Sequence, residues 1–418
     1  MPEKRPALLT LTALYNYLAG FVPAYFLTTY FSSLFIGLIP FLLISLLFQI
    51  VCGTTLLILL RSGFLDIDWH KHRVPLVVLA VAASVPIFAL IVSLQFPGLY
   101  DQRLIFMEPS LHPIFFGLTI ISTGAGLWLF NTIDRAGLFH SIENLKIIHD
   151  LKRNRAGILL AVLFFLAYFN FTQQLNFPGH YTRDQYFETD ISDWIKRLTS
   201  QPPDEILPVR AVHPAVLLIL RPLTWLLSIP LNGDRLQAAF ILSALAGSAC
   251  VFMTWLIVKQ RTGSTSYALV SASLLSASAS HLLLSSMLET YIFSALALIS
   301  FCFLLQNGRI SLRWTIPMGV VIFGITITNL AQACILYFLK LPRVKVMIQF
   351  IFAVILTTLL FNVLQVRVFP FSRPLYEPSN LLVEQNFGSN PFKASRQVFV
   401  GRVKLISRSI LLYGIAAP

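Results

Sequence analysis

Residues 157–171 read GILLAVLFFLAYFNF, a stretch without a charged side chain that is typical of a membrane-crossing helix. Similar runs of about 20 apolar residues recur along the chain, and a helix of that length crosses the hydrocarbon core of a bilayer. Backbone groups in hydrocarbon must find their partners within the protein, which favours helices. The 418 residues are 56% hydrophobic and 12% charged, which excludes an ordinary soluble globule. The sequence predicts an all-α, polytopic transmembrane helical bundle of about 9–11 spans.

The positive charge of the chain lies mainly in short loops between the apolar runs. The net charge is +13, and the positive-inside rule accounts for it without a nucleic-acid partner. The N-terminus, the loop 61–73 and the loop from Arg135 to Arg155 are therefore placed in the cytoplasm. This arrangement predicts five spans at 8–31, 33–60, 74–96, 112–131 and 157–171.

The apolar run that follows the fifth span differs from the others. Residues 211–231 contain three prolines and Arg221, which suit an interfacial helix better than a membrane crossing. We therefore expect 212–230 to lie along the outer surface as a juxtamembrane helix. Further spans are predicted at 235–258, 266–284, 287–306 and 346–366.

The segment 314–340 carries basic residues at both ends, which places both ends in the cytoplasm. We expect two half-spans that break near Thr326, Thr328 and Asn329. The chain then divides into three predicted regions, which are an N-terminal four-helix transmembrane region at 1–150, a transmembrane core at 151–370 with an outer loop at 173–233, and a basic extracytoplasmic segment at 371–418.

An acidic stretch stands out on the predicted outer face. Residues 183–220 hold six of the 18 carboxylates of the chain. A carboxylate at a membrane surface can act as a general base, and an ionisable group in an apolar segment indicates a functional site. The candidate catalytic residues are Asp190, Glu188 and Asp184. The candidate substrate-binding residues are Arg210, His213, Glu289, Tyr291, Thr328 and Asn329.

Several of these residues also have purely structural interpretations. Glu289 fits a helix N-terminus, where the helix dipole favours an acid, and His213 before a proline fits a turn. No paired histidine or cysteine spacing indicates a metal site. The acids permit a divalent metal ion, but their spacing does not require one.

The segment after residue 366 is basic although it is predicted to lie outside. One interpretation is an error of one span in the topology. The other is a patch that binds a lipid phosphate, with candidate residues Lys393, Arg396, Arg402 and Lys404.

The order of these pieces resembles that of GT-C-type integral membrane glycosyltransferases, the superfamily of protein O-mannosyltransferases and bacterial aminoarabinose transferases. The pieces are a span, the acidic FETDISDW, the helix VRAVHPAVLLILRPL and the span GDRLQAAFILSALAG; SSMLETYIFSALAL and FGITITNLAQACIL follow. The resemblance covers about 156–370. Two departures are the four preceding spans and the absence of the family's later helices before residue 418, so we expect a fragment of a longer chain.

The resemblance implies a GT-C-like core and a transferase that uses a polyprenyl-phosphate sugar at the outer face of a bacterial inner membrane. It makes Asp190 the first choice for the base, with Glu188 and Asp184 as alternatives. Arg210 and His213 would shape the donor or acceptor pocket, and Thr328 or Asn329 would lie near the lipid phosphate. The resemblance does not identify the acceptor, which could be a glycan, a lipid or a protein.

Two other functions are compatible with the same residues. A flippase or transporter of lipid-linked sugar would use a similar outer cavity, but inverted repeats, which would support it, are not evident. A non-catalytic subunit of a membrane assembly would need the acids only to solvate a loop.

Overall fold

The computed structural model shows a helical protein and describes most of the chain. The described residues are 17–61, 72–99, 101–137, 145–176, 190–200 and 207–383, with Leu14 and Val400 as single positions. Within these ranges the regular elements are helices, and one isolated parallel bridge joins Val209 to Ser372. The fold is therefore an all-α helical bundle, as the sequence predicts.

The described chain forms two compact units. Unit 1 contains Met1–Leu76 and Val92–Ile158, and unit 2 contains Val77–Ile91 and Leu159–Pro418. Helix α4 (Arg73–Gln95) contributes residues to both. The division predicted near residue 150 stays a prediction.

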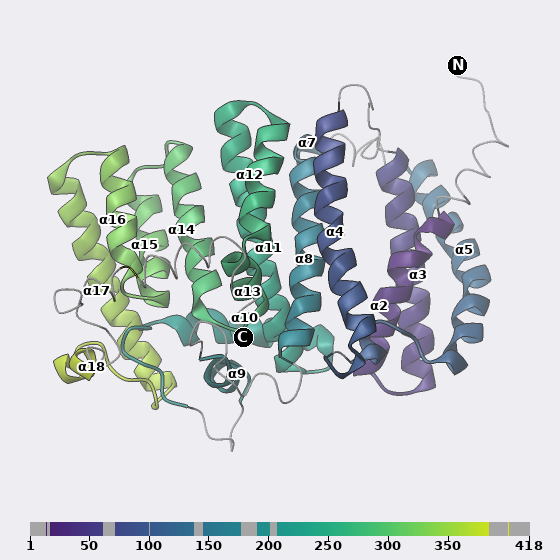
Figure 1. The fold of residues 1–418 in the computed structure, drawn as a ribbon, viewed down its shortest axis with the longest axis horizontal. Coiled ribbons are helices and arrows are strands. Elements are labelled where there is room, and N and C mark those ends of the chain that lie inside the picture. The colour runs from purple at the N-terminus through teal and green to yellow at the C-terminus, as the bar shows by residue number, and fades with distance from the viewer. Residues whose placement is uncertain are drawn as a thin grey trace. The chain divides into compact units, whose positions relative to one another are not determined.

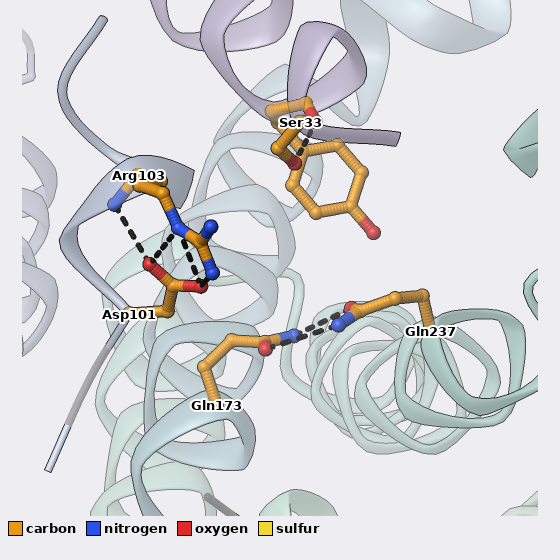
Figure 2. A network of polar contacts seen from close by, with 6 residues as sticks. Ser33, Asp101, Arg103, Gln173 and Gln237 are labelled. Carbon is orange, nitrogen blue, oxygen red and sulfur yellow. Dashed lines mark hydrogen bonds and ion pairs between the residues drawn. The ribbon is translucent and has the colours of Figure 1, made fainter. Parts of the chain in front are cut away.

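Unit 1 is built on the helices α2 (Phe21–Leu34), α3 (Leu38–Arg61), α5 (His112–Arg135) and α7 (Lys146–Arg153). Small residues let α3 and α5 approach the ring of Tyr17, because a Cβ added at Gly126 would lie 2.1 Å from the Tyr17 hydroxyl oxygen. That hydroxyl donates to the Ser122 carbonyl at 2.7 Å. Close packing through glycine is typical of helices in membranes. At the surface, Arg103 pairs with Asp101 at 2.8 Å (Figure 2).

The helices that follow belong to unit 2, apart from the first turn of α8, and Figure 1 labels them. They are α8 (Arg155–Leu175), α9 (Ile191–Thr199), α10 (Val216–Ser228), α11 (Arg235–Thr262), α12 (Thr265–Ala277), α13 (Ala279–Ser286), α14 (Thr290–Gln306), α15 (Leu312–Ile325), α16 (Asn329–Lys340), α17 (Val344–Val368) and α18 (Pro378–Val383). α11 shows how local sequence sets the bounds. The Asp234 side chain caps its start by accepting from the Gln237 N–H at 2.9 Å, and Gly263 ends it in a left-handed conformation at φ 69°.

The described helices include several that can cross a membrane. Six are long and apolar enough: Leu38–Leu60, Arg73–Gln95, Gln102–Arg135, Arg155–Leu175, Arg235–Thr262 and Val344–Val368. The pair α12 and α13, bent by 65°, gives a seventh if it is one span. α14 and α15 are shorter apolar helices within predicted spans, and α2 covers residues 21–31 of the predicted span 8–31. The chain is an integral, multi-pass membrane protein.

Two unusual segments have the form that the sequence predicts. α10 contains Pro222 and runs crosswise to α11 (Figure 1). The chain breaks between α15 and α16 at residues 326–328. The Tyr337 hydroxyl, near the end of α16, donates at 2.8 Å to the carbonyl of Ile310, just before α15. α15 and α16 therefore form a hairpin whose two ends away from the break meet.

Candidate functional site

Glu289 lies in the turn between α13 and α14 and is the buried carboxylate of the site. Only 5% of its surface is exposed. Its Oε2 accepts from the Thr290 N–H at 3.0 Å, which caps α14, and its Oε1 accepts from the Asp190 N–H at 2.7 Å. Burial raises the pKa of Glu289 to about 7, and the two N–H donors oppose that rise. Near neutral pH this carboxyl group is therefore close to its protonation midpoint.

Asp190 stands directly before α9, in the acidic stretch. Its backbone is held by Glu289, 99 positions further along the chain. Its own side chain makes no capping hydrogen bond to α9 and is partly exposed. The structure thus positions Asp190 through its main chain, while its side chain does not cap α9.

α9 carries a buried arginine stacked on a tryptophan. Arg197 is 5% exposed; its Nε donates to the Pro208 carbonyl at 3.1 Å and its Nη2 to Asp193 at 3.1 Å. The guanidinium lies 4.9 Å from the Trp194 ring centre. Burial lowers the pKa of Arg197, while Asp193, Asp190 and Glu289 favour its charged form. Arg197 therefore contributes positive charge beside the two carboxylates.

His213 connects α9 to the break between α15 and α16. Its ring meets that of Trp194 edge to face, with centroids 5.2 Å apart. Its Nδ1 lies 2.7 Å from the Ile325 carbonyl and 3.4 Å from the Thr326 hydroxyl. Because a carbonyl can only accept, Nδ1 carries the proton. Exchange of a proton by His213 would therefore take place at Nε2.

The segment around His213 is held from three directions. The Ala215 N–H donates to Gly324 at 2.9 Å, and the Ile327 N–H donates to Val212 at 3.1 Å. From α17, the side-chain amide of Gln365 donates to the His213 carbonyl at 3.1 Å and that of Asn362 to the Pro214 carbonyl at 3.0 Å. These contacts make the segment a rigid support, which suits a site that needs fixed geometry.

The other candidate binding residues lie on neighbouring elements. Tyr291, in the first turn of α14, is exposed and within electrostatic reach of Glu289, Asp190 and Arg210. Thr328 is exposed at the start of α16. Asn329 is buried, and its Nδ2 has no hydrogen-bond partner among the described residues. The structure therefore gathers Asp190, Arg210, Glu289 and Tyr291, and joins His213 to them through α9.

A polar pair lies at the end of α8, in the same unit. The side-chain amides of Gln173 and Gln237 face each other, with Nε2 of Gln173 donating to Oε1 of Gln237 at 2.8 Å (Figure 2). Gln174 donates to the Ala89 carbonyl at 3.0 Å. These amides hold α8, α11 and part of α4 together.

Several predicted residues lie outside the described ranges. They are Glu188, Asp184, Lys393, Arg396, Arg402 and Lys404. Within the described residues, no group of three histidine, cysteine, aspartate or glutamate side chains is placed to hold a metal ion.

Sequence reasoning missed three residues that build the site, namely Arg197, Asn362 and Gln365. Asn362 and Gln365 are three positions apart in an otherwise apolar span, so they share a helix face. That spacing was a usable signal. No comparable signal in the sequence marks Arg197, because an acid and a base four residues apart, such as Asp193 and Arg197, are common on exposed helices.

No family model, curated protein or solved structure matches this chain.

Proposed function

We propose that the chain is a membrane glycosyltransferase, which moves a sugar from a polyprenyl-phosphate donor to an acceptor at the extracytoplasmic face. One observation carries the proposal: buried Glu289 binds the backbone of Asp190 across 99 positions, beside the positive charge of Arg197. An accessible carboxylate on a backbone fixed in this way suits a general base. We assign the protein to a bacterial inner membrane on the strength of the family resemblance.

The proposed reaction uses Asp190 as the base. The acceptor hydroxyl oxygen bonds to the anomeric carbon of the donor sugar while its proton passes to Asp190. The bond between that carbon and the phosphate oxygen breaks, and polyprenyl phosphate leaves with the electron pair. Arg210 stabilises the charge that develops on the phosphate, and His213 and Tyr291 contact the sugar or the acceptor.

The extracytoplasmic placement rests on the distribution of charge. Lys259 and Arg261 lie in the last turn of α11. Lys340 ends α16 and Arg343 follows it, and both helix ends are those opposite Asp190. The positive-inside rule places such ends in the cytoplasm. A polyprenyl-phosphate donor presents its sugar at the other face, which fits the acidic stretch.

The first test is sugar transfer by purified Asp190→Asn and wild-type protein, with radiolabelled donors. We expect at least a hundredfold loss of transfer, roughly the contribution of a general base, with unchanged size-exclusion behaviour. Asp150→Asn, an exposed acid of α7, is the matched control and should keep full activity. Activity retained in Asp190→Asn would transfer the role to Glu188 or Asp184.

A second candidate is a transporter of lipid-linked sugar. The observation that favours it is the pair of interrupted helices, α12–α13 and α15–α16, because transporters often place binding sites at broken helices. Donor lipid that is bound and moved across proteoliposomes without sugar transfer would support this alternative. Donor lipid that is neither moved nor used for transfer would favour a non-catalytic subunit.

A further inference from the structure

The crosswise helix α10 has two different faces. Leu217, Leu220, Thr224 and Ser228 are buried against the rest of unit 2. The opposite side exposes Leu223, Trp225, Leu226 and Ile229, each between 42% and 59%. An exposed apolar side on a helix that lies across the spans is typical of a helix at the membrane surface. Arg221 and Trp225 are four residues apart on α10, and Ile229, directly after the helix, continues this spacing, so the three form one stripe.

Arg221, at the head of this stripe, has an incomplete set of partners. Its Nη2 donates to the Ser200 carbonyl at the end of α9 at 2.5 Å. Its guanidinium carbon lies 5.2 Å from the Phe369 ring centre. Its Nη1 is buried and has no hydrogen-bond partner among the described residues. Leaving a buried charged donor unpaired is costly, so Nη1 is suited to an acceptor from outside the chain.

The local charge around Arg221 also favours an anion. Burial lowers the pKa of Arg221, and the nearby Arg235 lowers it further. No carboxylate of the described residues contributes to that balance. Among the described residues, the two arginines have no acid between them, which favours an anion. A guanidinium matches a phosphate group through paired hydrogen bonds.

The neighbours of Arg221 place it at the level of lipid headgroups. Arg235 is the first residue of α11, and Phe369 directly follows α17, both of which are long enough to span. The ends of spanning helices lie near the membrane–water interface, where tryptophan residues such as Trp225 are enriched. At that level a headgroup phosphate can reach Arg221, and the exposed apolar side chains of α10 can contact acyl chains.

We infer that Arg221 and Arg235 bind the headgroup phosphate of an anionic phospholipid whose acyl chains lie along Trp225 of α10 and Ile229 directly after it. The inference does not depend on the proposed transferase activity. The site is also separate from Asp190, because Arg221 contacts the other end of α9.

The test is native mass spectrometry of the full chain with dioleoyl-phosphatidylglycerol or dioleoyl-phosphatidylcholine. We expect one phosphatidylglycerol to be retained in preference to phosphatidylcholine. Arg221→Gln should weaken that binding roughly tenfold, the usual effect of losing one charge-assisted contact. Arg221→Lys should keep only part of the lipid binding, because an ammonium group lacks the planar pair of N–H donors of a guanidinium. Arg309→Gln is the matched control, since Arg309 also lies over an aromatic ring, that of Trp314 at 4.8 Å, and this variant should bind the lipid normally.

Two surface variants keep the test decisive if the Arg221 variants fold poorly. Arg235→Gln and Trp225→Ala alter partly or fully exposed residues, and both should weaken phosphatidylglycerol binding. Unchanged binding in these two would overturn the inference. So would equal retention of phosphatidylcholine, displacement of the lipid by inorganic phosphate, or a preference for polyprenyl phosphate over phosphatidylglycerol.

Discussion

At the scale of single residues, Glu289 shows how one carboxylate connects distant parts of the chain. It is the only carboxylate between residues 235 and 376, so the sequence alone marks it as unusual. The sequence also predicts one of its contacts, the cap on α14, because helix dipoles favour an acid there. The bond to Asp190 could not be predicted, since no local pattern relates positions 99 apart.

The raised pKa of Glu289 predicts how stability depends on pH. The pKa rises from 4.5 to about 7 on folding. Between these values the folded state holds a proton that the unfolded state has released. The free energy of unfolding therefore falls as pH rises through this window and stays lower above it. We expect the melting temperature in detergent to fall between pH 5 and about 7.5.

The matched variant for this prediction is Glu289→Gln, which cannot ionise. It keeps an amide oxygen for the Asp190 N–H, and its melting temperature should depend less on pH than that of the wild type. Because it loses the second acceptor for Thr290, it should also melt lower below about pH 5. An identical pH dependence in the two proteins would show that Glu289 does not titrate in this range.

At the scale of elements, α17 acts as a brace for the segment that carries His213. Asn362 donates to the Pro214 carbonyl and accepts from the Leu375 N–H at 2.8 Å. Asn362→Ala would leave both groups without their partner, at a cost of about 1–3 kcal/mol. We expect a lower melting temperature for Asn362→Ala. Val363→Ala changes the neighbouring, half-exposed residue and should lower the melting temperature far less. Equal losses in the two variants would show that Asn362 does not stabilise the His213 segment.

The elements also show what sequence reasoning could reach. The break between α15 and α16 followed from basic residues at both ends of an apolar segment, because a single crossing would leave one end on the wrong side. The crosswise course of α10 followed from its prolines and Arg221. The amides of α17 had a visible pattern, but their partners are main-chain groups 148 positions away. Such pairings depend on three-dimensional packing, which hydropathy does not encode.

At the scale of the whole molecule, the arrangement of spans predicts the side of each loop. Asn307 and Arg343 flank the α15–α16 hairpin, and Tyr376 follows α17. Cysteines placed at Asn307 and Arg343, in a variant without the native cysteines, should react with an impermeant maleimide only from the cytoplasmic side. A cysteine at Tyr376 should react only from the opposite side. Labelling of all three from one side would contradict the topology.

The α15–α16 hairpin also affects the membrane around the protein. α15 has 14 residues, which gives a length of about 21 Å, whereas the hydrocarbon core is about 30 Å thick. The break at residues 326–328 is hydrogen-bonded to the segment directly before α10, so with α10 at the outer surface the cytoplasmic end of α15 stops short of the inner surface. Lipids next to the hairpin must then thin the bilayer or leave a depression. The mismatch grows with bilayer thickness, so a thicker membrane would hold the hairpin at a higher energetic cost.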